Sequence, residues 1–293
     1  MDFVLIGAQK AGSTFLHHAI LHHPGLRMPV GEVPVFEYPT YSPGALEWLD
    51  GLLSQTPGGA VRGIKRPDYL GRPEAPRLIH RHAPDCRLLV VLREPVSRTV
   101  SAYYHYMRRG HLPALPPDEG IPLLIEGAFD EAWPRAWEVL AFSRYGECLD
   151  RYLDLFRPEQ LCLLVQDDVI RDPSGALRRI YEHLGVDADY VPPGLDQRAL
   201  PTVYSLPRVR FLAWAQCFRP DEHGFAPPAL SSLPGQLLYL AAMGLDRAVL
   251  GPLLGNPRPV LRPSTLDALR RALADDRPRV LHHLGRVPSS WSP

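Results

Sequence analysis

Four short aliphatic runs constrain the fold of this chain more than any other feature of its sequence. They occupy residues 2–7, 60–65, 86–92 and 160–165. Each run is almost continuously apolar and lacks the alternation of a half-exposed strand, which is typical of parallel strands covered on both faces. We therefore predict four buried strands in one parallel sheet.

Patterns typical of helices separate and follow these runs. They cover residues 13–23, 74–82, 97–109, 145–156, 174–184 and 265–284. Alternation of strands and helices predicts an α/β fold, a doubly wound parallel sheet flanked by helices. We expect a single domain over residues 1–293. Residues 1–185 would form the α/β core and residues 186–293 a loop-rich, helical C-terminal part on the acceptor side.

The composition excludes several classes of protein. Of the 293 residues, 45% are hydrophobic and 22% charged, which suits a globular core and argues against global disorder. Lys+Arg and Asp+Glu both number 32, so we expect no nucleic-acid partner. The basic residues comprise 30 arginines and only two lysines, Lys10 and Lys65. Coding bias toward arginine accounts for the ratio but not for lysine at these two positions.

The cysteines indicate a reducing compartment. Their spacings match neither a disulfide framework nor a C-x-x-C metal site. The N-terminal residues lack the basic region of a signal peptide. We therefore expect a cytoplasmic protein with reduced core thiols at Cys86, Cys148, Cys162 and Cys217.

The most apolar segment, residues 236–254, is interrupted by Asp246 and Arg247. It falls short of the roughly 18 uninterrupted apolar residues that a membrane span requires. We expect an amphipathic or buried helix here and no stable membrane insertion; contact with a membrane or lipid substrate is the less favoured alternative.

The first predicted strand runs into the glycine-bearing loop Gly7-Ala-Gln-Lys-Ala-Gly-Ser-Thr14 and then into a helix. Loop N–H groups and the positive end of the helix dipole converge there on an anion, and Ser13 and Thr14 can add hydroxyl donors. The spacing is close to Walker A, but its lysine, Lys10, lies inside the loop and not directly after the second glycine. The loop predicts a P-loop-like phosphate site and disfavours a Walker A nucleoside triphosphatase.

A second anion site is predicted after the third strand. Arg93 follows that strand at its carboxyl end, where open α/β sheets place ligands. Ser101 lies about two turns into the next helix, which Pro95 is suited to begin. An arginine and a serine so placed suit a phosphate, although Arg93 alone also fits a structural ion pair. Two sites on one sheet indicate a ligand with two separated phosphate-like groups.

Both segments resemble motifs of sulfotransferases that use 3′-phosphoadenosine 5′-phosphosulfate (PAPS). The loop resembles their 5′-phosphosulfate-binding loop, and Arg93-x-Pro-x-x-Arg98-x-x-Ser101-x-Tyr103 resembles their 3′-phosphate motif, in the same order. The resemblance implies PAPS as donor and adenosine 3′,5′-bisphosphate (PAP) as product. It assigns donor binding to Gly7, Gln9, Lys10, Ala11, Gly12, Ser13, Thr14, Arg93 and Ser101.

Two further segments resemble the heparan-sulfate type of sulfotransferase, including bacterial members. Glu32-Val-Pro-Val-Phe36 resembles its Glu-x-x-x-Phe segment, whose glutamate is the catalytic base, and Lys65-Arg-Pro-Asp-Tyr69 resembles its Lys-x-Pro-x-Tyr segment. The match covers most of residues 1–185 and is weak over 190–260. Gly31 stands where a lysine is common, and the cysteine-bounded loop of the Golgi enzymes is absent, so acceptor recognition cannot be carried over.

The resemblance implies transfer of a sulfuryl group to a hydroxyl of a carbohydrate or small-molecule acceptor. Such a reaction is an in-line displacement that needs positioning, charge neutralisation and a base. Lys10 would stabilise the leaving phosphate oxygen, Lys65 would contact the sulfuryl group or Glu32, and Glu32 would take the acceptor proton. No metal is required. Glu37 is the rival carboxylate, and a histidine is the other alternative base.

Several residues carry two interpretations. The cluster His17, His18, His22 and His23 has the spacing of metal ligands but is interpreted as surface or packing residues. The three tyrosines after Ser101 are interpreted as core packing, with an acceptor-cleft wall as the alternative: Tyr103, Tyr104 and Tyr106. Arg208 and Arg210 lie where a closing loop could reach the 3′-phosphate. A nucleotide kinase or phosphotransferase, or a non-catalytic nucleotide-binding relative, remains as an alternative function.

Overall fold

The computed structural model describes residues 1–54, 59–195, 202–218 and 233–291. Within these residues one parallel sheet has the strand order β2-β3-β1-β4-β5. The four predicted strands are confirmed, and the two-residue β2 was not predicted. The strands are β1 (Phe3–Gly7), β2 (Leu26–Arg27), β3 (Val61–Lys65), β4 (Arg87–Leu92) and β5 (Leu161–Val165).

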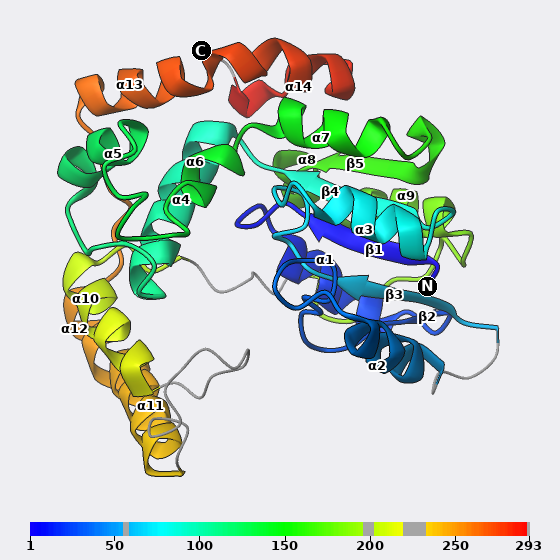
Figure 1. The fold of residues 1–293 in the computed structure, drawn as a ribbon, viewed down its shortest axis with the longest axis horizontal. Coiled ribbons are helices and arrows are strands. Elements are labelled where there is room, and N and C mark those ends of the chain that lie inside the picture. The colour runs from blue at the N-terminus through cyan, green and yellow to red at the C-terminus, as the bar shows by residue number, and fades with distance from the viewer. Residues whose placement is uncertain (55–58, 196–201, 219–232, 292–293) are drawn as a thin grey trace. The chain divides into compact units, whose positions relative to one another are not determined.

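The centre of the sheet is β1, which lies between β3 and β4 (Figure 1). Leu5 is opposite Lys65 on β3 and Leu89 on β4. The chain builds β2 and β3 on one side of β1 and then β4 and β5 on the other. The direction of winding therefore reverses at β1 and β4, and open α/β sheets bind ligands beyond the carboxyl ends of strands at such a point.

The chain divides into two compact units, and the division differs from the expected one at residue 185. The first unit comprises Met1–Arg98, Phe142–Leu200 and Ala274–Pro293, and the second comprises Thr99–Ala141 and Pro201–Leu273. The C-terminal residues thus belong with the α/β core. The helix α4 (Pro95–Arg108) runs from the first unit into the second.

Helices flank the sheet in the first unit, as the strand–helix alternation predicted (Figure 1). They are α1 (Ser13–His22), α2 (Pro43–Ser54), α3 (Ala75–His82), α7 (Tyr145–Leu153), α8 (Gln166–Arg171), α9 (Pro173–Leu184) and α14 (Arg277–Leu284), with short 3₁₀ turns at Pro158–Gln160, Ala274–Asp276 and Ser289–Trp291. All five residues of β1 are buried. A Cβ on Gly63 of β3 would lie 2.4 Å from the Phe3 ring, so glycine there makes room for an aromatic side chain in the core.

The second unit is helical in its described residues. It contains the rest of α4 with α5 (Pro117–Ile125), α6 (Glu138–Ala141), α10 (Leu206–Ala215), α11 (Leu233–Leu245), α12 (Gly251–Leu254) and α13 (Pro263–Leu273), besides a 3₁₀ turn at Gln216–Phe218 and a π-helical segment at Asp246–Leu250. Glu138 is fully buried and accepts hydrogen bonds from Tyr106 and Arg135. This satisfied buried carboxylate joins α4 to α6.

The single helix predicted over residues 265–284 is two helices, α13 and α14. Asp276 lies at the break, and its carboxylate accepts hydrogen bonds from the backbone N–H groups of Gly146 and Glu147, both at 2.8 Å. Those groups belong to the first turn of α7, where N–H groups lack partners within the helix. The break therefore serves the N-terminus of another helix, which periodicity cannot reveal.

The apolar segment before α13 corrects another expectation. Of the helices in the described residues, Pro234–Leu254 is long and apolar enough to cross a membrane by length and composition, with a mean hydropathy of 1.5. Only 11% of the 18-residue window that meets this test is buried. Of the two expected alternatives, the buried helix was therefore wrong, and the amphipathic helix stays a prediction. Asp246, which was taken as an interruption, is buried and paired with Arg208.

Three of the four cysteines lie in the core as expected. Cys86, Cys148 and Cys162 are buried free thiols, and burial raises the pKa of each. The prediction of a core position was wrong for Cys217, which is free and exposed.

Candidate functional site

The loop between β1 and α1 contains two residues with a positive φ. Gly12 precedes α1 with φ 101°, and Lys10 adopts φ 68°. Both angles lie in the left-handed region, which costs a non-glycine residue about 1–2 kcal/mol. The Ala8 N–H donates to the carbonyl of Val91 at 2.8 Å and so fastens the loop to β4. The N–H groups of Phe15 and Leu16 donate to the Gly12 carbonyl at 3.0 and 3.4 Å. Anion binding at this helix N-terminus stays a prediction.

Gly7 allows the chain after β3 to approach the end of β1. A Cβ at this position would lie 2.8 Å from Leu70 Cβ and 3.0 Å from the Pro67 carbonyl oxygen. The approaching chain is bonded to β1, since the N–H groups of Arg66 and Leu70 donate to the carbonyls of Leu5 and Ile6. The two segments with family motifs therefore meet at the carboxyl edge of the sheet.

Two arginines brace the loop from the segment after β4. Arg93 donates from Nη1 to the Lys10 carbonyl at 3.3 Å, which places this predicted phosphate ligand at the loop. Arg98 is fully buried, and its Nε and Nη2 donate to the backbone and side-chain oxygens of Gln9 at 3.1 and 3.0 Å. Sequence reasoning gave Arg98 no role, although the motif contains it. The structure shows that it holds Gln9 in place.

Lys65 ends β3 with its ammonium group between the loop and Glu32. Its Nζ lies 3.3 Å from Thr14 Oγ1 and 3.5 Å from Glu32 Oε1, so the expected contact with Glu32 is present. The side chain is only 5% exposed. Burial lowers the pKa of Lys65 below its ordinary value, while Glu32 acts in the opposite direction. The only lysine besides Lys10 thus lies directly beside the loop that contains Lys10.

Glu32 combines an accessible carboxylate with firm backbone anchors. Its side chain is 40% exposed, and its Oε2 accepts from Arg66 Nη1 at 2.9 Å. The next residue, Val33, donates its N–H to the Lys65 carbonyl and accepts a hydrogen bond from the Tyr69 hydroxyl. An accessible carboxylate beside two cations can take a proton from a bound hydroxyl.

Glu37, the rival carboxylate, is enclosed. It is 6% exposed and accepts from Arg66 Nη2 at 2.6 Å, with Arg72 Nε 3.7 Å away. Burial raises the pKa of Glu37, and the Arg66 guanidinium acts against that rise. A buried carboxylate held by two arginines has no access to an acceptor, so its place in the site is structural.

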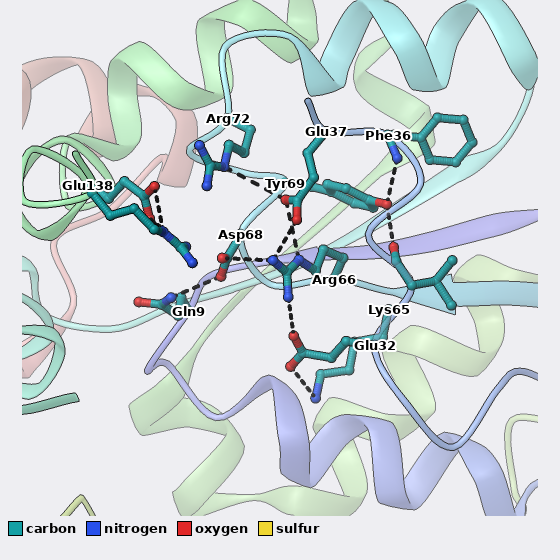
Figure 2. A network of polar contacts seen from close by, with 12 residues as sticks. Gln9, Glu32, Phe36, Glu37, Lys65, Arg66, Asp68, Tyr69, Arg72 and Glu138 are labelled. Carbon is teal, nitrogen blue, oxygen red and sulfur yellow. Dashed lines mark hydrogen bonds and ion pairs between the residues drawn. The ribbon is translucent and has the colours of Figure 1, made fainter. Parts of the chain in front are cut away.

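Figure 2 shows how these groups form one polar network around Arg66. Glu32, Glu37 and Asp68 all point at its guanidinium group, and Asp68 in turn accepts from Gln9 Nε2 at 2.9 Å. Arg66 and Asp68 lie within the quoted family segment, but sequence reasoning gave them no role. Apart from the pair Arg66 and Asp68, the partners in the network are separated by 29 to 59 positions in the chain, so no local spacing could have found it.

The histidines of α1 have separate environments. His17 is buried and its Nε2 lies 2.8 Å from the Pro29 carbonyl, while burial lowers its pKa to about 4. His23 is buried and bonded to the Asp187 carbonyl, whereas His18 and His22 are exposed. These are packing and surface positions, as interpreted. Among the residues the structure describes, no group of three or more His, Cys, Asp or Glu is placed to hold a metal ion.

The remaining predicted residues lie in the second unit. Ser101 is buried, and its hydroxyl lies 2.8 Å from that of Thr202. The tyrosines Tyr103, Tyr104 and Tyr106 are at most 3% exposed, as core packing requires.

Arg208 and Arg210 lie on the helix α10 and not on a loop. Arg208 donates to Asp246 from Nε at 2.9 Å and from Nη2 at 2.8 Å, and Arg210 donates to the Ala114 carbonyl. A role of Arg208 at the 3′-phosphate stays a prediction.

A cavity of about 250 Å³ lies elsewhere, along α9, and is lined among others by Leu177, Arg178 and Tyr190. None of the predicted site residues lines it. The convergence of motifs and charges at the edge of the sheet is the stronger guide to the site.

A family model described as "Sulfotransferase domain" matches residues 1–199, more than half of the chain. The chain belongs to the sulfotransferase family. Heparan sulfate glucosamine 3-O-sulfotransferase 6 of Mus musculus is 31% identical over 142 residues, and the protein of the same name from Homo sapiens is 30% identical. Each match covers 48% of this chain and 40% of the relative, so the chain spans less than half the length of these relatives.

The solved structure of a sulfotransferase from Alicyclobacillus acidocaldarius has a similar fold. Its TM-score is 0.68 with 20% sequence identity, and the match covers 99% of this chain and 98% of that one. The likeness supports the P-loop-like fold predicted from the first loop.

Proposed function

We propose that this protein transfers the sulfuryl group of PAPS to a hydroxyl group of a carbohydrate or small-molecule acceptor. The observation that carries the proposal is the position of Lys65, whose ammonium group lies between Thr14 of the loop and the accessible carboxylate of Glu32. This arrangement sets a donor-binding loop and a base on either side of one buried cation. The curated relatives are named for sulfation of heparan sulfate, which makes a saccharide the first acceptor to test.

In this proposal, the loop from Gly7 to Thr14 holds the 5′ end of the donor, and Arg93 and Ser101 hold its 3′-phosphate. Glu32 takes the proton of the acceptor hydroxyl as its oxygen bonds to sulfur. The bond between sulfur and the bridging phosphate oxygen breaks, and Lys10 stabilises the charge that stays on that oxygen. One such preorganised donor typically contributes about 10²–10³-fold to kcat, and a general base about 10²–10⁴-fold.

Calorimetry with PAP and with ATP tests the donor class. A 3′-phosphate is the group that ATP lacks, so we expect PAP to bind more tightly than ATP. Tighter binding of ATP would refute the sulfotransferase proposal and favour a nucleotide kinase or phosphotransferase.

Transfer from ³⁵S-labelled PAPS to heparan sulfate, small saccharides and phenols tests the reaction and identifies the acceptor. We expect Lys10→Ala and Glu32→Gln to abolish transfer, while Glu32→Gln still binds PAP. Full activity in Glu32→Gln would reassign the base, and PAP binding without transfer to any acceptor would indicate a non-catalytic relative. The cytoplasmic location and bacterial type expected from the sequence also stay predictions.

A further inference from the structure

Arg66 uses every nitrogen of its guanidinium group on a carboxylate. Its Nη1 donates to Glu32 Oε2 at 2.9 Å, and its Nη2 donates to Glu37 Oε1 at 2.6 Å and lies 3.3 Å from Asp68 Oδ2. Its Nε donates to the second oxygen of Glu37 at 3.3 Å. A planar guanidinium can serve several acceptors in fixed directions, whereas an ammonium group is a point charge without that geometry.

The three carboxylates differ in what they connect. Glu37 is buried and anchors Arg66 to the protein interior. Asp68 links Arg66 to the donor loop, because its other oxygen accepts from Gln9, which Arg98 holds in turn. Glu32 is the accessible member. A continuous chain of polar contacts therefore joins the loop to Glu32 through Arg66 (Figure 2).

Glu32 needs these contacts to hold its position, because the residues that precede it are exposed. It follows Val30, which is 83% exposed, and Gly31, which is also exposed. The Arg66 side chain itself is only 12% exposed and is fully engaged with the carboxylates, so it is not arranged to bind an acceptor. A displacement of about 1 Å in a reacting group can cost roughly 10²-fold in rate.

We propose that Arg66 is a positioning residue that holds the Glu32 carboxylate at a fixed place relative to the donor loop. The proposal rests on the proposed function, in which Glu32 is the base, and adds a residue that acts through it. Lys65 alone cannot do this, because its Nζ lies 3.5 Å from Glu32 Oε1 and must also face Thr14. Asp68, Glu37 and Glu32 all raise the pKa of Arg66 against the effect of burial, so its charge is permanent.

Two variants separate positioning from structural support. Arg66→Lys keeps the positive charge and removes the planar guanidinium group with its several donors. The double variant Arg66→Met/Glu37→Gln removes the guanidinium together with the Glu37 charge, so that no unpaired buried carboxylate remains at residue 37. The buried Asp68 carboxylate keeps its hydrogen bond from Gln9. Arg62→Met is the matched control, since Arg62 lies on β3, four residues before Arg66, is partly exposed and contacts Asp2.

Steady-state transfer from PAPS, with heparan sulfate or 4-nitrophenol as acceptor, gives the first measurement. We expect kcat to fall about 10²-fold in Arg66→Lys and in the double variant, with the KM for PAPS and the affinity for PAP close to native. Native kcat in the double variant would overturn the proposal, because Arg66 would then serve only to neutralise Glu37. A loss of PAP affinity equal to the loss of kcat would overturn it as well.

Hydrogen–deuterium exchange of the backbone amides at residues 30–33 gives a measurement that does not depend on activity. We expect faster exchange there in both Arg66 variants and native exchange in Arg62→Met. If the native protein transfers no sulfuryl group to either acceptor, the proposed function fails for them, and the exchange data still decide whether Arg66 holds the Glu32 segment. Unchanged exchange in both Arg66 variants would refute the tether.

Discussion

Lys65 is the residue in which burial and charge act most directly on the proposed chemistry. It is nearly inaccessible to solvent, so its charged form loses hydration, and Glu32 restores only part of that loss. An ammonium group with a lowered pKa gives up its proton at lower pH than an ordinary lysine. The site would then lose the cation between the donor loop and the base.

A pH dependence follows from this. We expect kcat to fall on the alkaline side at a pH below 10.5, the ordinary pKa of lysine, because neutral Lys65 no longer offsets the charge of the reacting groups. Lys65→Arg should turn over more slowly, since guanidinium does not fit the same space. Its rate should show no alkaline decline below pH 10.5, because arginine stays charged. An identical alkaline decline in both proteins would assign it to another group.

The sequence predicted part of the residue-scale picture. Lys10, Lys65 and Glu32 were predicted as site residues because each belongs to a short local motif, and the structure confirms the contact between Lys65 and Glu32. The convergence of three carboxylates on Arg66 was not predicted. Such clusters depend on how distant segments pack, and no local spacing encodes that.

At the scale of elements, the packing at the carboxyl edge of the sheet depends on how closely the chain after β3 approaches β1. Gly7→Ala would place a Cβ 2.8 Å from Leu70 Cβ and 3.0 Å from a carbonyl oxygen. Overpacking of this kind typically costs about 1–3 kcal/mol. We expect the free energy of unfolding in urea to fall by that amount, with a loss of activity because the displaced segment contains Arg66.

The control for this substitution is Gly44→Ala in α2. A Cβ at residue 44 meets nothing within 4 Å. Alanine is favoured over glycine in helices by up to about 1 kcal/mol, so stability should be unchanged or slightly higher. Equal losses in the two variants would show that the close approach at Gly7 is not the cause.

The first turns of α1 contain a second element-scale effect, at His17. Burial lowers its pKa from 6.5 to about 4, so the folded protein favours the neutral ring. The unfolded chain binds a proton as pH falls below 6.5, while the folded protein does so only near pH 4. Stability is therefore lost between those values, by up to about 3 kcal/mol at 1.36 kcal/mol per pKa unit.

His17→Gln tests this effect, because glutamine can donate to the Pro29 carbonyl but does not titrate. We expect urea unfolding at pH 7 and pH 4.5 to show a smaller loss of stability for the variant than for the native protein. All other titrating groups are common to both proteins, so the difference isolates His17. Parallel losses would mean that His17 does not contribute to acid sensitivity.

Strands were predicted correctly where apolar residues dominated the local sequence. The four strands were found because their sequences are rich in aliphatic residues, although β3 also contains Arg62 and Lys65. The two-residue β2 is too short to leave a pattern. The break between α13 and α14 was missed because Asp276 serves the distant N-terminus of α7. The exposure of Pro234–Leu254 was missed because apolar composition alone suggests burial.

At the scale of the whole molecule, the division into two units could not be read from the sequence. Continuity along the chain suggested a boundary near residue 185, but residues 274–291 pack with the α/β core and residues 99–141 with the second unit. The contacts of α14 with α7 and of α13 with α5 decide this, and both are long-range. Family motifs are dense in the first unit and sparse in the second, so the second unit was the least predictable part.

The scarcity of lysine in the whole chain provides the last test. Arginine fills 30 of 32 basic positions, and both lysines occur in segments with family motifs. An ammonium group is a compact point charge, and a guanidinium group spreads its charge over a plane. If Lys10 stabilises charge on one leaving oxygen, Lys10→Arg should lower kcat by about 10²-fold or more while PAP affinity is largely kept. Arg62→Lys, at a partly exposed site on β3, should leave kcat unchanged. Native turnover in Lys10→Arg would show that the reaction does not require a lysine at residue 10.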